Sequence, residues 1–357
     1  ISRRLWDEKR GCFYSHIDLQ GQAHKANYYT DLVFPQLYSD LPLAYRYQSL
    51  DSLKQRLVFP SKTTGLPLMQ VGDFKPTIFS NDNVMPTQIA EVCIALLQTG
   101  DIELALGLLE SVSLAATVYT DSPGSMPERM SDEGRGEPNY KLGNGIASFI
   151  QCYIIGLFGL YRDECGRCLH VEPAFPDDWD SASLHLPYGG FVFTRDTVGT
   201  IQLNISCPDC ETVALGVVLP PCANVILLID GVESPLTLEP LLGHSRLCAR
   251  IVTNGRNQIA VTIRPKIVRN MQLEPLTAIE GEPVISGLKP VFSHPALEGN
   301  AQPGQYRVPV CSEAATCYLE QAVTVLPRAA IRVLELPARG DHGYAVQLMA
   351  ELPAERR

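Results

Sequence analysis

The hydrophobic pattern of this chain changes its period once, and that change limits the folds that it can adopt. Over residues 1–161 apolar side chains recur every three or four positions, as on one face of a helix. From about Cys168 they alternate with polar side chains, as in a strand. With 357 residues, 45% of them apolar and 19% charged, the chain has an ordinary globular composition and enough length for two or three domains. We therefore expect a packed multidomain protein whose helical part precedes its β-sheet part.

The helical part contains recognisable helix ends. Pro86 suits a first helical turn, Gly100 is expected to end that helix, and Asp101 is expected to cap the next helix. The last expected helix carries apolar residues around most of its circumference, so we expect it to be buried over a wide arc. The expected helices cover residues 27–38, 43–58, 83–99, 101–118 and 144–161.

The connections between these helices alternate in length. Short turns at 40–42 and 99–101 alternate with long polar loops at 11–26, 59–82 and 119–143, and each long loop precedes a more apolar helix. Loops this long inside a compact domain usually have a function. Because successive helices of a hairpin array run antiparallel, we expect the three long loops to lie at one end of the helices. This arrangement is typical of an (α/α) toroid, in which such loops surround a central cleft.

Short strand-like segments dominate the rest of the chain. Between residues 183 and 263 six alternating runs are separated by turn dipeptides such as Gly189-Gly190 and Asn254-Gly255, a pattern that predicts an antiparallel β-sandwich. Further strand-like runs follow. The predicted fold class is thus multidomain, α then β, with a partial (α/α)6 toroid of helical hairpins over 1–161, an antiparallel β-sandwich over 162–265 and a second β-rich region over 266–357.

Three segments carry a resemblance to known enzymes. They are LWDEKRGCFY at 5–14, SMPERMSDEGRGEPNYKLGNGIASFIQCYIIGLFGL at 125–160 and HVEPAFPDDWDSASLHLPYGGFVFTRD at 170–196. Over about residues 1–265 the chain resembles bacterial glycosidases of the six-hairpin (α/α)6 superfamily, which includes α-L-rhamnosidases, toroid-type α-L-fucosidases and glycogen-debranching glucosidases. Only about half of a toroid's helices are expected here, so the resemblance implies that an amino-terminal half is missing.

The resemblance also implies an activity. A protein of this kind hydrolyses oligo- or polysaccharides with two carboxyl groups, one that protonates the leaving oxygen and one that activates water or attacks directly. Two alternatives stay open, a non-catalytic carbohydrate-binding or structural module and a glycoside phosphorylase. The expected partner is therefore a carbohydrate.

The candidate catalytic residues lie in two of the long loops. Glu128 is the predicted base, because the resemblance places a catalytic glutamate in the loop ahead of the last inner helix. Arg129 beside it is expected to keep the carboxylate ionised by charge pairing, and the competing interpretation is an ion pair that only orders the loop. Asp73 is the predicted acid, since the glycine before it lets the backbone approach a ligand and aromatic neighbours can shield its carboxyl group.

The other site predictions concern sugar binding. Aromatic faces and polar side chains hold sugars, and the region around 11–31 offers several of both. Core packing is the competing interpretation for the tyrosines, a structural hydrogen bond for the histidine, and a helix cap for Asp82, which is also an alternative acid. The predicted substrate-binding residues are His24, Tyr28, Asp31, Asp82, Arg129 and Tyr140.

Charge and motifs argue against other classes of partner. The net charge of -10, from 29 basic and 39 acidic residues, disfavours a nucleic-acid partner, and no local basic patch offsets it. The longest apolar stretch, 146–160, is too short and too interrupted to span a membrane. No phosphate loop, GxGxxG, HExxH or GxSxG motif is present, so no cofactor is predicted.

The eleven cysteines leave two questions open. Their odd number and their spread over the chain favour reduced thiols, yet both a cytoplasmic and a periplasmic or secreted location stay open. The CxxC pairs at 165–168 and 207–210 allow a zinc site, but their central residues are already explained as hairpin turns, so no metal is predicted.

Overall fold

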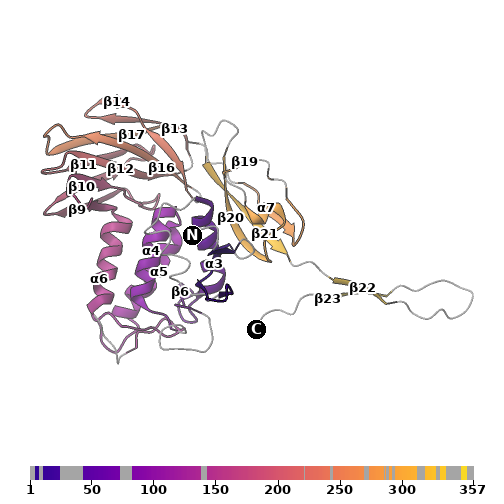
Figure 1. The fold of residues 1–357 in the computed structure, drawn as a ribbon. Coiled ribbons are helices and arrows are strands. Elements are labelled where there is room, and N and C mark those ends of the chain that lie inside the picture. Colours follow the sequence, from indigo (N-terminus) through magenta and orange to yellow (C-terminus); the bar gives the residue numbers. More distant parts are fainter. Residues whose placement is uncertain are drawn as a thin grey trace, which may run out of the picture.

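A computed structural model describes most of the chain, and Figure 1 shows its parts. A helical layer lies beside two large sheets, a smaller sheet follows, and a two-stranded hairpin extends away near the carboxy terminus. The described residues are 5–7, 11–24, 43–72, 83–137, 143–220, 222–241, 244–268, 273–284, 286, 289–291, 294–311, 318–326, 330–334 and 347–351.

The helices of the described ranges begin and end largely where their end residues predict. Pro86 lies in the first turn of its helix, and Gly100 takes a left-handed conformation with φ 89° and ends it, so both predictions are confirmed. Asp101 occupies the predicted N-cap position of α5, but its side chain makes no cap hydrogen bond and binds Lys54 and Arg307 instead. The helices are α3 (Leu43–Leu57), α4 (Pro86–Thr99), α5 (Ile102–Thr117), α6 (Gly143–Gln151) and the single turn α7 (Pro295–Glu298).

The predicted partial (α/α)6 toroid is wrong, and with it the predicted fold class. Most elements are strands, and the described ranges hold five helices, of which only four exceed one turn. Segments expected as open loops form short hairpins instead, because glycines at positive φ such as Gly11, Gly21 and Gly65 let the chain reverse and pair with itself. The helix expected over 27–38 lies outside the described residues. The hairpins pair β1 (Trp6–Asp7) with β2 (Cys12–Phe13), β3 (His16–Ile17) with β4 (Ala23–His24), and β5 (Val58–Pro60) with β6 (Pro67–Met69).

The single helix predicted over 144–161 is also wrong. Helix α6 ends at Gln151 and continues as a π-helix, η1 (Cys152–Leu157), after which strand β7 (Leu160–Arg162) begins. Ile146 and Ile150 are 45% and 52% exposed, so α6 is not buried over a wide arc. The apolar residues that follow lead into strand β7, where Leu160 is fully buried. Helical spacing alone does not reveal that these residues pack in the sheet rather than on a helix.

Helix α4 occupies the centre of the helical layer. It packs against α5, α6 and η1, and none of these helices has the length and hydropathy of a membrane span within the described residues. Ten of its 14 residues are buried, and the four half-buried ones, Thr87, Gln88, Glu91 and Gln98, lie together on one side. A Cβ atom at Gly156 of η1 would come within 2.9 Å of Leu97 in α4, so this glycine allows the two helices to approach closely.

Two sheets face each other above the helices (Figure 1). Side chains from both, such as Phe191 and Leu203 of one and Leu215 and Leu247 of the other, belong to the same buried core. The six-stranded sheet has the order β14 (Val232–Ser234), β13 (Cys222–Ile229), β17 (Gln258–Val268), β11 (Ile201–Ser206), β10 (Gly189–Arg195) and β9 (Ser181–Leu186). The five-stranded sheet has the order β15 (Thr237–Pro240), β16 (Ser245–Val252), β12 (Thr212–Leu219), β8 (Cys168–Val171) and β7.

The five-stranded sheet departs from the predicted antiparallel arrangement at one pair. Strands β8 and β12 run parallel, with Thr212 opposite Cys168 and Leu215 opposite Val171. Parallel neighbours require a long crossover. Here the crossover consists of β9, β10 and β11, which belong to the opposite sheet.

The carboxy-terminal part has a sheet and a core of its own. Its core includes Val308, Val310 and Val323, together with residues of α7. It contacts α3, where the Gln55 side chain donates a hydrogen bond to the carbonyl of Gln305 at 3.0 Å. The sheet has the order β18 (Leu276–Ile279), β21 (Tyr318–Leu326), β20 (Gly304–Cys311) and β19 (Lys289–Pro290), and a separate hairpin pairs β22 (Ala330–Leu334) with β23 (Gln347–Glu351).

Gly159 fixes the passage from helix to sheet. It lies between η1 and β7 at φ +60°, and a Cβ atom there would sit 2.1 Å from the carbonyl oxygen of Glu172. The backbone around it is fully engaged, since Glu172 N–H donates to Gly159 and Ala174 N–H donates to Leu157, both at 2.9 Å. No side chain fits without moving the first strands of the sheet.

We predict that Gly159→Ala lowers the free energy of unfolding by roughly 3 kcal/mol or more, because backbone strain and a backbone clash act together. Gly166→Ala is the matched control: its φ is +68° but no atom lies within 4 Å of the added methyl group, so the loss should be about 1 kcal/mol. Urea denaturation of both variants measures the difference. Equal losses would contradict the clash.

Candidate functional site

Two of the three long loops meet at the amino-terminal end of α4. Isolated antiparallel bridges join Gln70 to Val84, Val84 to Met130 and Met130 to Gly136. The backbone N–H of Met130 donates to the carbonyl of Val84 at 2.8 Å. Val84 stands two residues before Pro86, the first residue of α4. The loops expected over 59–82 and 119–143 therefore meet at the same end of the helical layer, as the connection lengths predicted for these two loops.

The loop that carries Glu128 is anchored along its length. Met130 and Met126 are buried in the core. Lys62 forms an ion pair with Asp132, and the Ser61 hydroxyl donates to the carbonyl of Glu133 at 2.8 Å. These contacts tie the loop to the segment before β6, so its backbone is held at two separate points.

Glu128 lies two residues before Met130 and is half-buried. The first turn of α4 is close to this bridge, and the positive end of a helix favours an anion. The carbonyl of Arg129 accepts a hydrogen bond from Glu137 N–H at 3.0 Å, which fixes the backbone beside Glu128. The predicted pairing of the Glu128 and Arg129 side chains stays a prediction.

Five of the predicted site residues lie outside the described residues, although their neighbours are informative. Val71 N–H donates to the carbonyl of Asn83 at 2.9 Å, so the two ends of the segment between them are joined at the same bridge. The undescribed residues are Tyr28, Asp31, Asp73, Asp82 and Tyr140.

His24 lies in a hairpin of its own. Its Nε2 atom is 2.8 Å from Asp18 Oδ2, and its ring stacks on that of His16 with centroids 4.5 Å apart. The hydrogen bond from His24 holds the pKa of Asp18 below its usual value. These contacts match the structural interpretation of His24, and its role in substrate binding stays a prediction.

Metal chemistry has little support in the described part of the chain. There, no group of three or more His, Cys, Asp or Glu side chains is arranged to hold an ion. Of the CxxC cysteines, Cys165 is exposed, whereas Cys168, Cys207 and Cys210 are buried. Burial raises the pKa of the Cys207 and Cys210 thiols above its usual value.

A hollow that the sequence did not predict lies on the outer face of the five-stranded sheet. It is an open groove of about 530 Å³, which is within the usual range for small-molecule sites. We call it the sheet groove. Its lining includes Glu172, Gly216, Thr237, Glu239, Arg246 and Arg250. One of the alternating runs predicted from the sequence falls within β12, but it did not indicate that small outward residues would hollow this face of the sheet.

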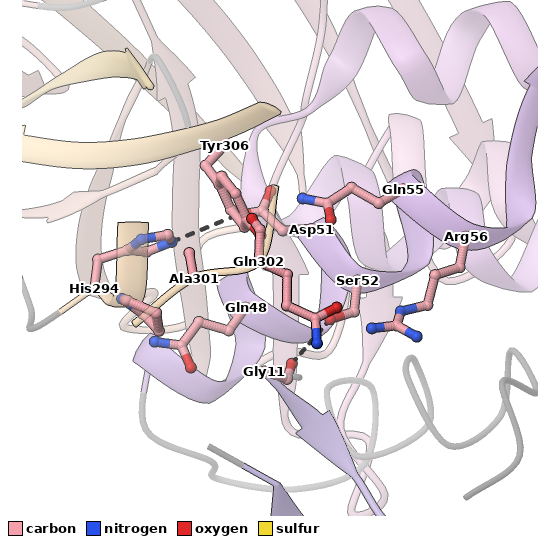
Figure 2. A pocket seen from close by; sticks show the side chains of 11 residues that line it. Gly11, Gln48, Asp51, Ser52, Gln55, Arg56, His294, Ala301, Gln302 and Tyr306 are labelled. Atoms are coloured by element: carbon pink, nitrogen blue, oxygen red, sulfur yellow. Dashed lines mark hydrogen bonds and ion pairs between the residues drawn. The ribbon is translucent and has the colours of Figure 1, made fainter. Parts of the chain in front are cut away.

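A second, much smaller cavity lies between α3 and the carboxy-terminal part (Figure 2). Its volume of about 30 Å³ suits about two water molecules rather than a substrate. His294, 1% exposed, points toward Asp51, with Nε2 and Oδ2 3.5 Å apart. His294 Nδ1 accepts a hydrogen bond from Ala296 N–H at 3.1 Å, so the ring proton lies on Nε2 and faces the carboxylate.

The Asp51 carboxylate begins a chain of alternating charges. Lys54 Nζ lies 3.3 Å from Asp51 and 3.0 Å from Asp101, which in turn lies 3.2 Å from Arg307 of β20. Burial alone would lower the pKa of Lys54, but the two carboxylates outweigh it and raise that pKa above its usual 10.5. The charges therefore join α3, the turn between α4 and α5, and the carboxy-terminal sheet.

Comparison with known proteins gives distant similarities. No protein-family model matches the chain. Trigger factor of Bacillus mycoides (strain KBAB4) is 24% identical over 183 residues, which cover 48% of this chain and 42% of that protein. A solved structure of a GH127 β-L-arabinofuranosidase from Geobacillus stearothermophilus T6 aligns with 90% of this chain and 55% of its own, at 11% identity and a TM-score of 0.30.

These similarities do not establish a family. The identity to trigger factor is low, and the chain spans less than half of that protein's length. A TM-score of 0.30 does not establish a common fold. Function must therefore be argued from the residues of this chain.

We predict that Lys54→Met lowers the free energy of unfolding by about 3–5 kcal/mol, because it leaves two buried carboxylates without their shared cation. Lys62→Met is the matched control. Lys62 and its partner Asp132 are 67% and 52% exposed, so little stability should be lost. Chemical denaturation measures both.

Wild type and Lys54→Met, compared over a range of pH, test the charge of Lys54. Folding raises the pKa of Lys54 above 10.5. The stability that its positive charge adds is therefore complete below pH 10.5 and is lost as the pH rises through the pKa of the folded protein. The stability gap between wild type and Lys54→Met should stay constant from about pH 6 to 9 and shrink above 10.5. A gap that falls steadily between pH 6 and 9 would show that another group dominates.

Proposed function

We propose that this chain belongs to a glycoside hydrolase-like protein that acts on oligo- or polysaccharides, with Glu128 as the general base. The single observation that carries the proposal is the series of bridges from Gln70 through Val84 to Met130. It brings the loop that carries Glu128 next to the ends of the loop in which the candidate acids were predicted. The resemblance of the sequence to carboxylate glycosidases supports the choice of reaction.

The position of Glu128 suits a base. A general base must accept a proton from the attacking water, which a carboxylate side chain can do. The anchored backbone on either side of Glu128 limits its movement, which helps to hold a catalytic group in one geometry. Half-burial leaves part of the side chain open to a ligand.

The second carboxyl group is proposed to come from the other loop. Asp73 is the candidate acid and Asp82 the alternative. In this mechanism the acid protonates the glycosidic oxygen while Glu128 removes a proton from the water that attacks the anomeric carbon, so the leaving group departs as an alcohol. Arg129 contributes positive charge beside the base.

We predict that Glu128→Gln in the full-length protein lowers hydrolysis of its best substrate by about 10²–10⁴-fold, since the amide cannot accept the proton. A panel of 4-nitrophenyl glycosides identifies that substrate, and kcat/KM measures the loss. The melting temperature should remain unchanged, because a half-exposed isosteric replacement removes no packing.

Glu133→Gln is the control, since it lies in the same loop with an exposed side chain. Its turnover should match wild type. Full activity of Glu128→Gln would remove Glu128 from the mechanism. Release of sugar phosphate that depends on added phosphate would identify a phosphorylase instead, and binding of oligosaccharide without any turnover would identify a non-catalytic module.

A further inference from the structure

We propose that the sheet groove is a binding site for a neutral oligosaccharide segment, separate from the loops around Glu128. The groove lies on a sheet face that the proposed mechanism does not use. Its floor, its walls and its charges each favour this occupant. The choice of a carbohydrate rests in part on the proposed function.

The floor of the groove is set by strand register. Ala214 stands opposite Arg250, and Gly216 stands opposite Cys248, which in turn stands opposite Thr237 on β15. Small side chains thus occupy the middle of three adjacent strands. Because the Glu172 side chain lies over Gly216, a ligand ring would approach the floor at Cys248 and Thr237.

One wall is a carboxylate held in place. Glu172 Oε1 lies 2.9 Å from His170 Nδ1 and 3.4 Å from the Tyr161 hydroxyl. The Tyr161 and His170 rings stack 4.3 Å apart. A Cβ atom at Gly216 would come within 2.9 Å of Glu172 Cγ, so the Glu172 side chain lies over this glycine. The carboxylate is therefore oriented before any ligand arrives.

The opposite wall pairs a second carboxylate with a guanidinium. Glu239 stands directly across from Arg246 in the register of β15 and β16. Arg246 is itself fixed, because its Nη2 donates to the carbonyl of Gln98 at 2.6 Å. Burial, followed by the charge of Glu239, raises the pKa of the Cys248 thiol between the walls to about 12, so the floor is uncharged at neutral pH.

The balance of charge selects the ligand. The lining carries two carboxylates, Glu172 and Glu239, and two guanidiniums, Arg246 and Arg250. An anion would be repelled by the carboxylates and a cation by the guanidiniums, so the groove favours a neutral ligand. Arg46 of α3 lies close to Arg246 and Glu239 but is not part of the lining. An apolar ligand would cover charged groups without replacing their hydrogen bonds.

A polyol meets these requirements. Each hydroxyl group both donates and accepts, so neighbouring hydroxyls can donate to a carboxylate and accept from a guanidinium. A peptide strand would instead add to the edge of the sheet, whereas the groove lies across its face. A neutral sugar segment therefore fits best.

The two sites lie at opposite ends of α4. Gln98, near the carboxy-terminal end, contacts Arg246, whereas Val84, just before the amino-terminal end, pairs with Met130. The 14 residues of α4 span about 21 Å at 1.5 Å per residue. A binding defect at the groove can thus be separated from a catalytic defect at Glu128.

The test measures binding of neutral gluco-, xylo-, arabino- and galacto-hexasaccharides by calorimetry. Glu128→Gln serves as the background so that no substrate is consumed. Gly216→Val displaces the Glu172 side chain that lies over this glycine, and Arg250→Ala removes an exposed donor. Arg264→Ala is the control, since Arg264 is an exposed arginine on the other sheet. Circular dichroism melting confirms that each variant is folded.

We expect at least one hexasaccharide to bind, and both groove variants to weaken it about tenfold or more while the control does not. The proposal is overturned if the groove variants bind as tightly as Arg264→Ala. It is also overturned if no hexasaccharide binds, or if the groove binds an unrelated peptide instead of the hexasaccharides. If groove-dependent binding persists but the wild type hydrolyses no glycoside, the proposed function fails and the binding site stands.

Discussion

The burial of one broad face of α4 is the constraint on which the rest of the structure depends. Ile89, Val92, Cys93 and Leu96 are all 0% exposed and follow one another at helical spacing, so other elements must cover this face of the helix. Helices α5, α6 and η1 cover it laterally. A helix packed along such a face has little freedom to slide or rotate, because protein interiors pack at crystal-like density. Its two ends therefore give fixed reference points, one for the loops around Glu128 and one for the five-stranded sheet.

Charge, rather than apolar area, marks the junction of the carboxy-terminal part with α3. Asp51 and Asp101 are nearly inaccessible, and each shares Lys54. Buried ion pairs contribute little net stability, but an incomplete one is costly. The junction therefore tolerates only the arrangement in which His294 and Arg307 reach their acidic partners, and this requirement sets orientation more than it adds affinity.

Local chemistry was predictable from the sequence, whereas long-range arrangement was not. Pro86 and Gly100 act through their own backbone restrictions, so their roles follow from residue type. Asp101 looked like a cap, but a lysine 47 residues away competes for its carboxylate. Helical spacing over 144–161 concealed the π-helix and the passage into a strand. Of the candidate site, the shared loop end was predictable from connection lengths, but the sheet groove depends on the register of strands far apart in sequence.

The parallel pairing of β8 and β12 has a consequence for biosynthesis. Three strands of the opposite sheet lie between them in sequence, and β17, which ends at Val268, enters the middle of that opposite sheet between β13 and β11. Neither sheet can be completed before the other is well advanced. A nascent chain must therefore expose unpaired strand edges until residue 268 leaves the ribosome, and pairings of such high sequence separation form slowly. Protection of these edges by a chaperone would act during that interval, before any ligand site exists.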